Sequence, residues 1–156
     1  MASPDEHDLA VPPDLALRYE WRAASMPPPS HYEYAISIGP GAQGEIAFLP
    51  DYAQHDPPVW REHVAVTGEA LAGLYAVLRR VAVFSRPWRR AARPPIGDSH
   101  DWLDVTAGGT TVRVPSHLDA KCEAAIEPVY EAVRALVPQE VWARLMAQRE
   151  AFIQAY

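Results

Sequence analysis

Two adjacent glycines, Gly108 and Gly109, divide the segment Asp101–Pro115 into two halves that match each other residue by residue. A two-residue turn is the commonest way to join two antiparallel strands, and it needs backbone conformations that glycine tolerates. The register that this turn sets places apolar residues opposite one another on one side and complementary polar residues opposite one another on the other. The predicted pairs are Leu103–Val114 and Val105–Val112 on the apolar side, and Asp104–Arg113 and Thr106–Thr111 on the polar side.

Alternation of apolar and polar residues predicts further antiparallel strands in the first half of the chain. The segments with this pattern are 15–24, 32–38, a strand that starts at Ile46, and a short one over 60–66. Glycines between positions 39 and 44 supply a turn, so the second and third segments form a hairpin. Met26 and the three prolines after it interrupt the pattern, because proline lacks a backbone donor. We expect a loop at Met26–Ser30, with a polyproline ligand for a partner as the alternative.

Three later segments carry apolar residues at helical spacing. The first helix is predicted over Gly68–Phe84, the second over 116–136 and the third from Pro138 onward. Their start signals are, in order, Thr67 as an N-cap, the capping-box spacing of Ser116 and Asp119, and a proline at the first helical position. Pro128 lies inside the second helix, where its ring clashes with the preceding turn, and is expected to kink or divide that helix.

These elements predict the α+β class: an antiparallel sheet of about four to six strands with two to three helices packed on one face. A length of 156 residues suits one hydrophobic core. Residues 1–13 hold three acids and two adjacent prolines with little apolar periodicity, which predicts a flexible acidic N-terminal arm. Residues 14–156 are then a single α+β domain.

Cys122 is the only cysteine, which excludes an intramolecular disulfide and a thiolate metal cluster. It falls on the apolar stripe of the second predicted helix and is expected in the core. The chain has neither the cationic start of a secretory leader nor the roughly 18 consecutive apolar residues of a membrane span. We therefore expect a cytoplasmic protein with no membrane partner.

Six arginines between Arg79 and Arg93 occur without an acidic residue among them. The other positions hold eight basic residues against 20 acidic ones, a formal balance of minus twelve. Such a segregated charge attracts acidic groups, and a tryptophan within it can stack on a ring. The predicted binding residues are Arg86, Trp88, Arg89, Arg90 and Arg93. The alternative is a solvated loop that screens the protein's own acidic surface, and the net charge of −6 argues against nucleic acid.

A second group of polar residues lies close together in the sequence and comprises Asp98, Ser99, His100, Asp101 and Asp104. Such residues also occur in ordinary turns before a strand. A metal would need further ligands, for example from His31, His55 or His63, and the spacing of the histidines does not match a zinc-protease motif. There is no G-x-S-x-G elbow. We predict no metal ligand, no cofactor and no catalytic residue from these patterns.

Aromatic residues on neighbouring predicted strands form the third group, which comprises Tyr19, Trp21, Tyr32 and Tyr34, with Trp60 and Trp102 elsewhere. They are core residues if the helices cover their face of the sheet. If that face stays open, the same residues form a ligand groove or a protein interface.

The leading interpretation is a small non-catalytic binding or regulatory module that contacts a protein partner of acidic character through the arginine-rich segment. One alternative is a small enzyme whose site is assembled from distant Asp, His and Arg residues, and the other is nucleic-acid binding through the same loop. Convergence of Asp98, His100 and other histidines in one cleft would favour an enzyme. A further alternative is a homo-oligomer formed through the C-terminal helix.

Overall fold

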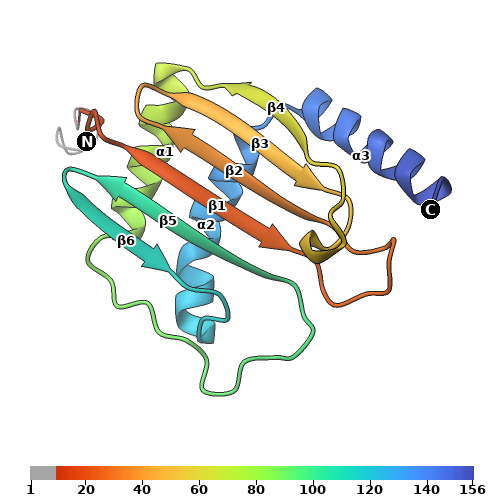
Figure 1. Ribbon diagram of the computed structural model, residues 1–156. Coiled ribbons are helices and arrows are strands. Elements are labelled where there is room, and N and C mark those ends of the chain that lie inside the picture. Colours follow the sequence, from red (N-terminus) through yellow and green to blue (C-terminus); the bar gives the residue numbers. More distant parts are fainter. Residues whose placement is uncertain (1–9) are drawn as a thin grey trace.

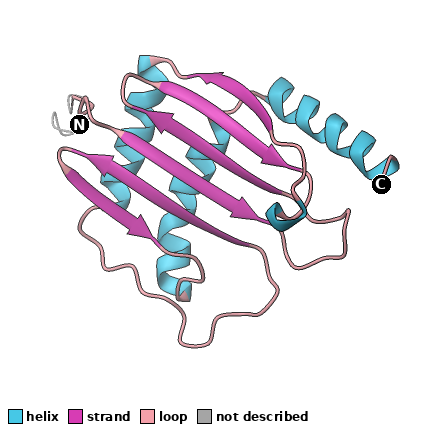
Figure 2. Ribbon diagram, viewed as in Figure 1, coloured by secondary structure: helices cyan, strands magenta, loops and turns pink. Residues whose placement is uncertain are grey.

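The computed structural model describes residues 10–156, which form an open six-stranded antiparallel sheet and three α-helices (Figures 1 and 2). The strands lie in the order β4-β3-β2-β1-β5-β6. Their bounds are β1 Ala16–Arg22, β2 Glu33–Gly39, β3 Gln43–Leu49, β4 Trp60–Ala65, β5 His100–Ala107 and β6 Thr110–Val114. The helices are α1 Gly68–Val81, α2 Ala120–Ala135 and α3 Gln139–Gln154, and a short 3-10 helix, η1, spans Ala53–His55. The predicted α+β class is confirmed.

Most of the predicted N-terminal arm lies outside the described residues. Of its last positions, Val11 packs partly buried against the core. The Pro12 carbonyl accepts a hydrogen bond of 3.1 Å from the backbone amide of Leu15. The chain is therefore attached to the domain before β1 begins.

Strand β1 lies at the centre of the sheet and pairs with β2 on one side and β5 on the other. Its residues Leu17 and Tyr19 are buried, and they face the same side as Trp21. We call this the inner face of the sheet, since α1 and α2 cross behind it in Figure 1. The opposite, outer face carries most of the charged members of the strands, among them Arg18 and Asp104, which lie opposite each other in the register of β1 and β5.

The hairpin predicted around Gly108 and Gly109 is confirmed in all four of its pairs. On the outer face Arg113 donates two hydrogen bonds to Asp104, of 2.7 and 2.9 Å. The turn has positive φ at both glycines, 59° and 77°. Asp14 accepts hydrogen bonds from both glycine amides, at 2.7 and 2.8 Å, which lowers the pKa of its carboxyl. A residue far away in the sequence thus stabilises a turn that local chemistry had already specified.

The helix termini differ from the predicted ones at three points, the first being that Pro138 is the N-cap of α3 and not its first helical residue. Thr67 caps α1 as expected, but α1 ends at Val81 because Ala82 adopts the left-handed conformation with φ 58°. The N-cap of α2 is Asp119 and not Ser116, since the Asp119 carboxylate accepts from the amide of Cys122 at 2.8 Å. Helix α2 continues through Pro128 without division. Within residues 10–156 no helix is long and apolar enough to cross a membrane.

In Figure 1 helix α3 runs beside the edge strand β4 and extends past the sheet, and its contacts are with residues of the inner face. Trp142 meets Tyr34 edge to face at 5.0 Å between ring centroids. Farther along, Arg144 donates to Glu62 on β4 at 2.7 Å. Leu145 is fully buried. All three helices therefore pack on one face of the sheet, as predicted, and within residues 10–156 no α-helix lies over the outer face.

Opposite faces of the confirmed hairpin should respond differently to substitution. Val105 is 1% exposed, so Val105→Asp places an unpaired carboxylate in the core and should strongly destabilise or unfold the domain. Thr111→Lys changes an exposed residue and removes one hydrogen bond to Thr106, so we expect a loss of about 1 kcal/mol or less. Chemical denaturation measures both, and equal losses would contradict the register.

Candidate functional site

The structure separates the arginine-rich segment into an anchored part and an exposed part. Arg86 and Trp88 are partly buried. The Arg86 Nε donates to the carbonyl of Val81 at 3.2 Å, and the Trp88 indole donates to the carbonyl of Val83 at 3.0 Å. The Arg86 guanidinium also lies 5.8 Å from the Trp88 ring centroid. These two side chains fasten the segment to the end of α1.

Arg89, Arg90 and Arg93 are exposed. The backbone of this segment is held against the start of α2, because the amide of Asp119 donates to the carbonyl of Arg89 at 2.8 Å and Arg90 forms a β-bridge with Leu118. Among residues 10–156 none of these three guanidinium groups forms an ion pair. Three cations are therefore displayed on an ordered backbone.

The loop that leads from α1 to β5 runs along the lower edge of the view in Figure 1, past the first half of α2. Between this loop, the inner-face ends of β1 and β5, and α2 lies a cavity of about 490 Å³. We call it the acidic cavity. Its lining includes the side chains of Trp21, Asp98, Ser99, His100, Asp101, His117, Glu123, Ile126, Glu127 and Tyr130.

Four of the five residues in the second predicted group thus converge in the acidic cavity. Asp104 does not, because it faces the outer side and is bonded to Arg113. The cavity adds residues that sequence reasoning missed. Glu123, Glu127 and Tyr130 are spaced as one face of a helix, which was a usable signal. The ring of His117 lies 5.2 Å from that of His100. No sequence signal pointed to His117, because it belongs to a connecting segment.

A chain of hydrogen bonds orients the carboxylate of Asp101 in the lining of the cavity. The Tyr19 hydroxyl donates to Asp101 Oδ2 at 2.9 Å. Arg134 donates to the Tyr19 oxygen at 3.0 Å through Nη1 and to Glu127 at 2.8 Å through Nη2. Burial raises the pKa of Asp101, and the hydrogen bond from Tyr19 opposes that rise. A carboxylate in such surroundings marks a functional-site candidate on physical grounds.

Tyr130 is the second unusual group of the acidic cavity. Its side chain is 2% exposed, and its buried hydroxyl has no hydrogen-bond partner. Burial raises the pKa of this phenol most, and the charges of Asp101 and Glu127 raise it further. The hydroxyl therefore lies within electrostatic reach of two carboxylates of the cavity. An unpaired buried polar group is rare in folded proteins and calls for an explanation.

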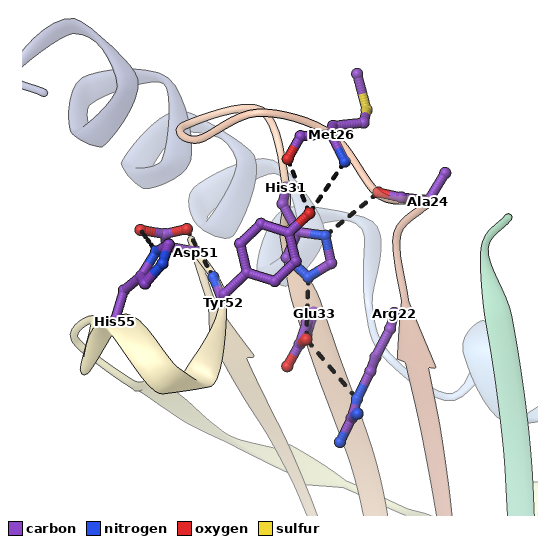
Figure 3. Close-up of polar contacts among 8 residues, drawn as sticks. All are labelled: Arg22, Ala24, Met26, His31, Glu33, Asp51, Tyr52 and His55. Carbon is purple, nitrogen blue, oxygen red and sulfur yellow. Dashed lines mark hydrogen bonds and ion pairs between the residues drawn. The ribbon is translucent and has the colours of Figure 1, made fainter. Parts of the chain in front are cut away.

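A separate polar cluster, drawn in Figure 3, joins the loop after β1 to the segment after β3. His31, 3% exposed, stacks on Tyr52 with 3.6 Å between ring centroids. The Tyr52 hydroxyl donates to the carbonyl of Met26 at 2.8 Å and accepts from its amide at 3.0 Å. Both backbone polar groups of Met26 are thus hydrogen-bonded, and the proline-rich loop is anchored to the domain.

The other members of this cluster are also paired with one another. The His31 Nε2 lies 2.9 Å from a carboxylate oxygen of Glu33. Buried Asp51 accepts from the amide of Tyr52 at 2.7 Å and contacts His55 at 3.0 Å. In Figure 3 the two histidines lie on opposite sides of the Tyr52 ring. We interpret this cluster as a structural support for two loops, since its side chains satisfy one another.

The aromatic group of the sequence is divided by the fold. Tyr19 and Tyr34 are buried in the core, and burial raises the pKa of Tyr34 to about 12. Trp21 is partly buried and forms a wall of the acidic cavity. Trp102 points to the outer face, where Arg22 lies 4.9 Å from its ring centroid. Trp21 therefore lines the acidic cavity, whereas Trp60 lines a separate hollow together with Arg61, Glu62 and Arg144.

Metal coordination has no geometric support in the part of the chain that the structure describes, where no three His, Cys, Asp or Glu side chains are placed to hold an ion. Cys122 is buried, as predicted, and contacts the carbonyl of Pro87 at 3.5 Å. No known family model matches the chain, and a search of curated proteins finds no relative.

Replacing the Asp101 carboxylate by an amide should stabilise the protein at neutral pH. Because burial raises the pKa of Asp101 above 3.8, the folded state holds this proton more tightly than the unfolded state, and stability is lost as the pH rises through the folded pKa. Asp101→Asn keeps an acceptor for Tyr19 and removes the charge. We expect a melting temperature a few degrees higher than wild type at pH 7, and no difference near pH 3.5.

Asp104→Asn is the matched control, because it changes an exposed carboxylate in the same strand that is paired with Arg113. It should melt at or slightly below the wild-type temperature at pH 7. Calorimetry at the two pH values measures all three proteins. A lower melting temperature for Asp101→Asn at pH 7 would mean that Arg134 and Tyr19 fully compensate the buried charge.

Proposed function

We propose that the chain is a small-molecule binding domain and that the acidic cavity is its ligand site. The observation that carries the proposal is the convergence of Asp98, His100 and Asp101 in one cavity, whose lining also includes Tyr130 with its buried, unpaired hydroxyl. A concave site with a few converging polar groups and perturbed pKa values is the usual form of a ligand site. The volume of about 490 Å³ falls in the range of roughly 300–1,000 Å³ typical of such sites.

Asp98, His100 and His117 converge in this cavity, which supports a small enzyme as the alternative, but the placement of the hydroxyl groups favours binding over hydrolytic catalysis. Ser99 is exposed at the rim, and within residues 10–156 no hydrogen bond joins it to His100 or His117. A serine nucleophile needs such a bond to an adjacent base. Asp101, in contrast, is oriented by the hydrogen bond from Tyr19, which suits recognition of a ligand at a defined position.

A second candidate function is contact with an acidic protein partner through Arg89, Arg90 and Arg93. It is supported by their exposure and by the absence of ion pairs to them within the described part of the chain. The fully exposed Ile96, at 99%, lies in the same loop and adds an apolar contact. Charged rims of this kind raise the association rate and confer salt sensitivity.

The ligand site can be located before the ligand itself is identified. We expect members of a mixed library of cationic, neutral and anionic fragments to shift the amide resonances of residues 98–101 and 117–130 in isotope-labelled protein. Ser99→Trp fills the rim of the cavity and should abolish these shifts. Ser85→Trp places the same ring at an exposed position outside the lining and should preserve them. Shifts confined to other segments, or unchanged by Ser99→Trp, would contradict the proposal.

The arginine contact is tested by changing Arg89, Arg90 and Arg93 to Ser while the anchored Arg86 and Trp88 are kept. The melting temperature should change little, since exposed charges shift stability by about 0.5 kcal/mol or less each. Binding to a polyglutamate peptide, measured by fluorescence anisotropy, should fall at least tenfold, and salt should weaken the wild-type binding.

The control for the arginine variant removes the same charge elsewhere, by changing Arg18, Arg61 and Arg113 on the outer face to Ser. These three are paired with carboxylates, so their contribution to binding an added acidic peptide should be smaller. An equal loss in both variants would show that net charge alone is responsible, and the segment would then be a solvated connection.

A further inference from the structure

We infer that the ligand of the acidic cavity is a small organic cation with a primary ammonium group. This inference rests on the proposed function, and it adds the chemical class of the ligand. The lining contains four carboxylates, two histidines and no lysine or arginine. The carboxylates are those of Asp98, Asp101, Glu123 and Glu127. A cleft with one sign of charge concentrates ligands of the opposite sign.

The neutralisation of these carboxylates within residues 10–156 is incomplete. Of the basic side chains that the structure describes, Arg134 alone bonds to one of them, and it contacts Glu127 from outside the lining. Asp98, Asp101 and Glu123 form no ion pair in the same part of the chain. A cation would therefore relieve an unfavourable charge density that the protein itself leaves in place.

Hydrogen-bonding capacity points specifically to an ammonium group. Asp101 uses Oδ2 to accept from Tyr19, and its other oxygen accepts from no described residue. Glu127 likewise bonds to Arg134 through one oxygen only. The Tyr130 oxygen is unpaired. The two carboxylate oxygens are acceptors only, the Tyr130 hydroxyl can accept as well as donate, and a primary ammonium group carries three donors and no acceptor. A quaternary ammonium would leave all three without a partner.

The remaining walls suit an apolar body attached to this cation. Trp21 and Ile126 line the cavity together with the ring of Tyr130. An aromatic ring attracts a nearby cation and packs well against an apolar or aromatic body. An anionic ligand would meet four carboxylates, and a metal ion would lack a set of three ligands within the described residues. The combination favours a small aromatic or aliphatic amine.

Three ligands of nearly equal shape and different charge test the inference on the full chain. Benzylamine, benzyl alcohol and benzoate are titrated into the labelled protein at neutral pH, and the shifts of residues 98–101 and 117–130 are followed. We expect benzylamine to bind at least tenfold more tightly than the alcohol, and benzoate to give no shifts there. Asp101→Asn should weaken benzylamine binding by about tenfold or more, because it removes the charge and keeps the shape.

Two further variants separate recognition from folding. Asp104→Asn, on the opposite face, should leave benzylamine affinity unchanged. Tyr130→Phe removes the unpaired hydroxyl, so the protein should melt at or above the wild-type temperature while its benzylamine affinity falls several-fold. A purely structural role for Tyr130 would leave the affinity as it was.

The outcomes distinguish this inference from the proposed function. If the alcohol or benzoate shifts the cavity residues at equal or lower concentration than benzylamine, the cation inference is wrong and the ligand site stands. If none of the three binds but a library fragment does, the charge of that fragment decides. A fragment without a cationic group overturns the inference. If no compound shifts these residues, both fail together.

Discussion

The antiparallel pairing of β1 with β5 is the constraint on which the rest of the structure depends. It sets Tyr19 opposite Leu103 in the core and Trp21 opposite Asp101 at the end of the same face. Because side chains alternate, a register that buries Leu103 also directs the Asp101 carboxylate toward the helices and the Asp104 carboxylate toward solvent. The location of the acidic cavity follows from this register, since the cavity lies where the apolar pattern of β5 begins.

The surroundings of Asp101 show that the fold tolerates its charge without neutralising it fully. Tyr19 supplies one hydrogen bond to Asp101, and Arg134, which bonds to Tyr19 and Glu127, acts on Asp101 by charge without bonding to it. Burial then raises the pKa of Asp101. Departures from a well-paired interior tend to occur where function requires them, and their cost is offset by packing elsewhere. Here that packing comes from β1, β2 and α2, whose buried side chains surround Tyr19.

The two polar clusters of the domain differ in how completely their groups are paired. Around His31 and Tyr52 each side chain bonds to a neighbour in the same cluster, and two loops are held together as a result. In the acidic cavity Tyr130 and one oxygen of Asp101 accept nothing from the described residues. Full pairing gives rigidity, whereas unpaired acceptors in a concave surface give capacity for a ligand. This contrast, more than charge or location, distinguishes support from candidate site.

The sequence by itself determined the elements whose physics is local. A two-residue glycine turn sets the register of the β5–β6 hairpin, and alternation assigns each strand residue to a face, so those predictions were correct. Helix ends were less certain, because Ala82 and Asp119 depend on how the following loop packs. The acidic cavity was decided only by tertiary structure. His117, in the connection before α2, and Glu123, in the first turn of α2, line the same cavity as Asp101. Their spacing along the chain does not encode the angle at which α2 crosses β5.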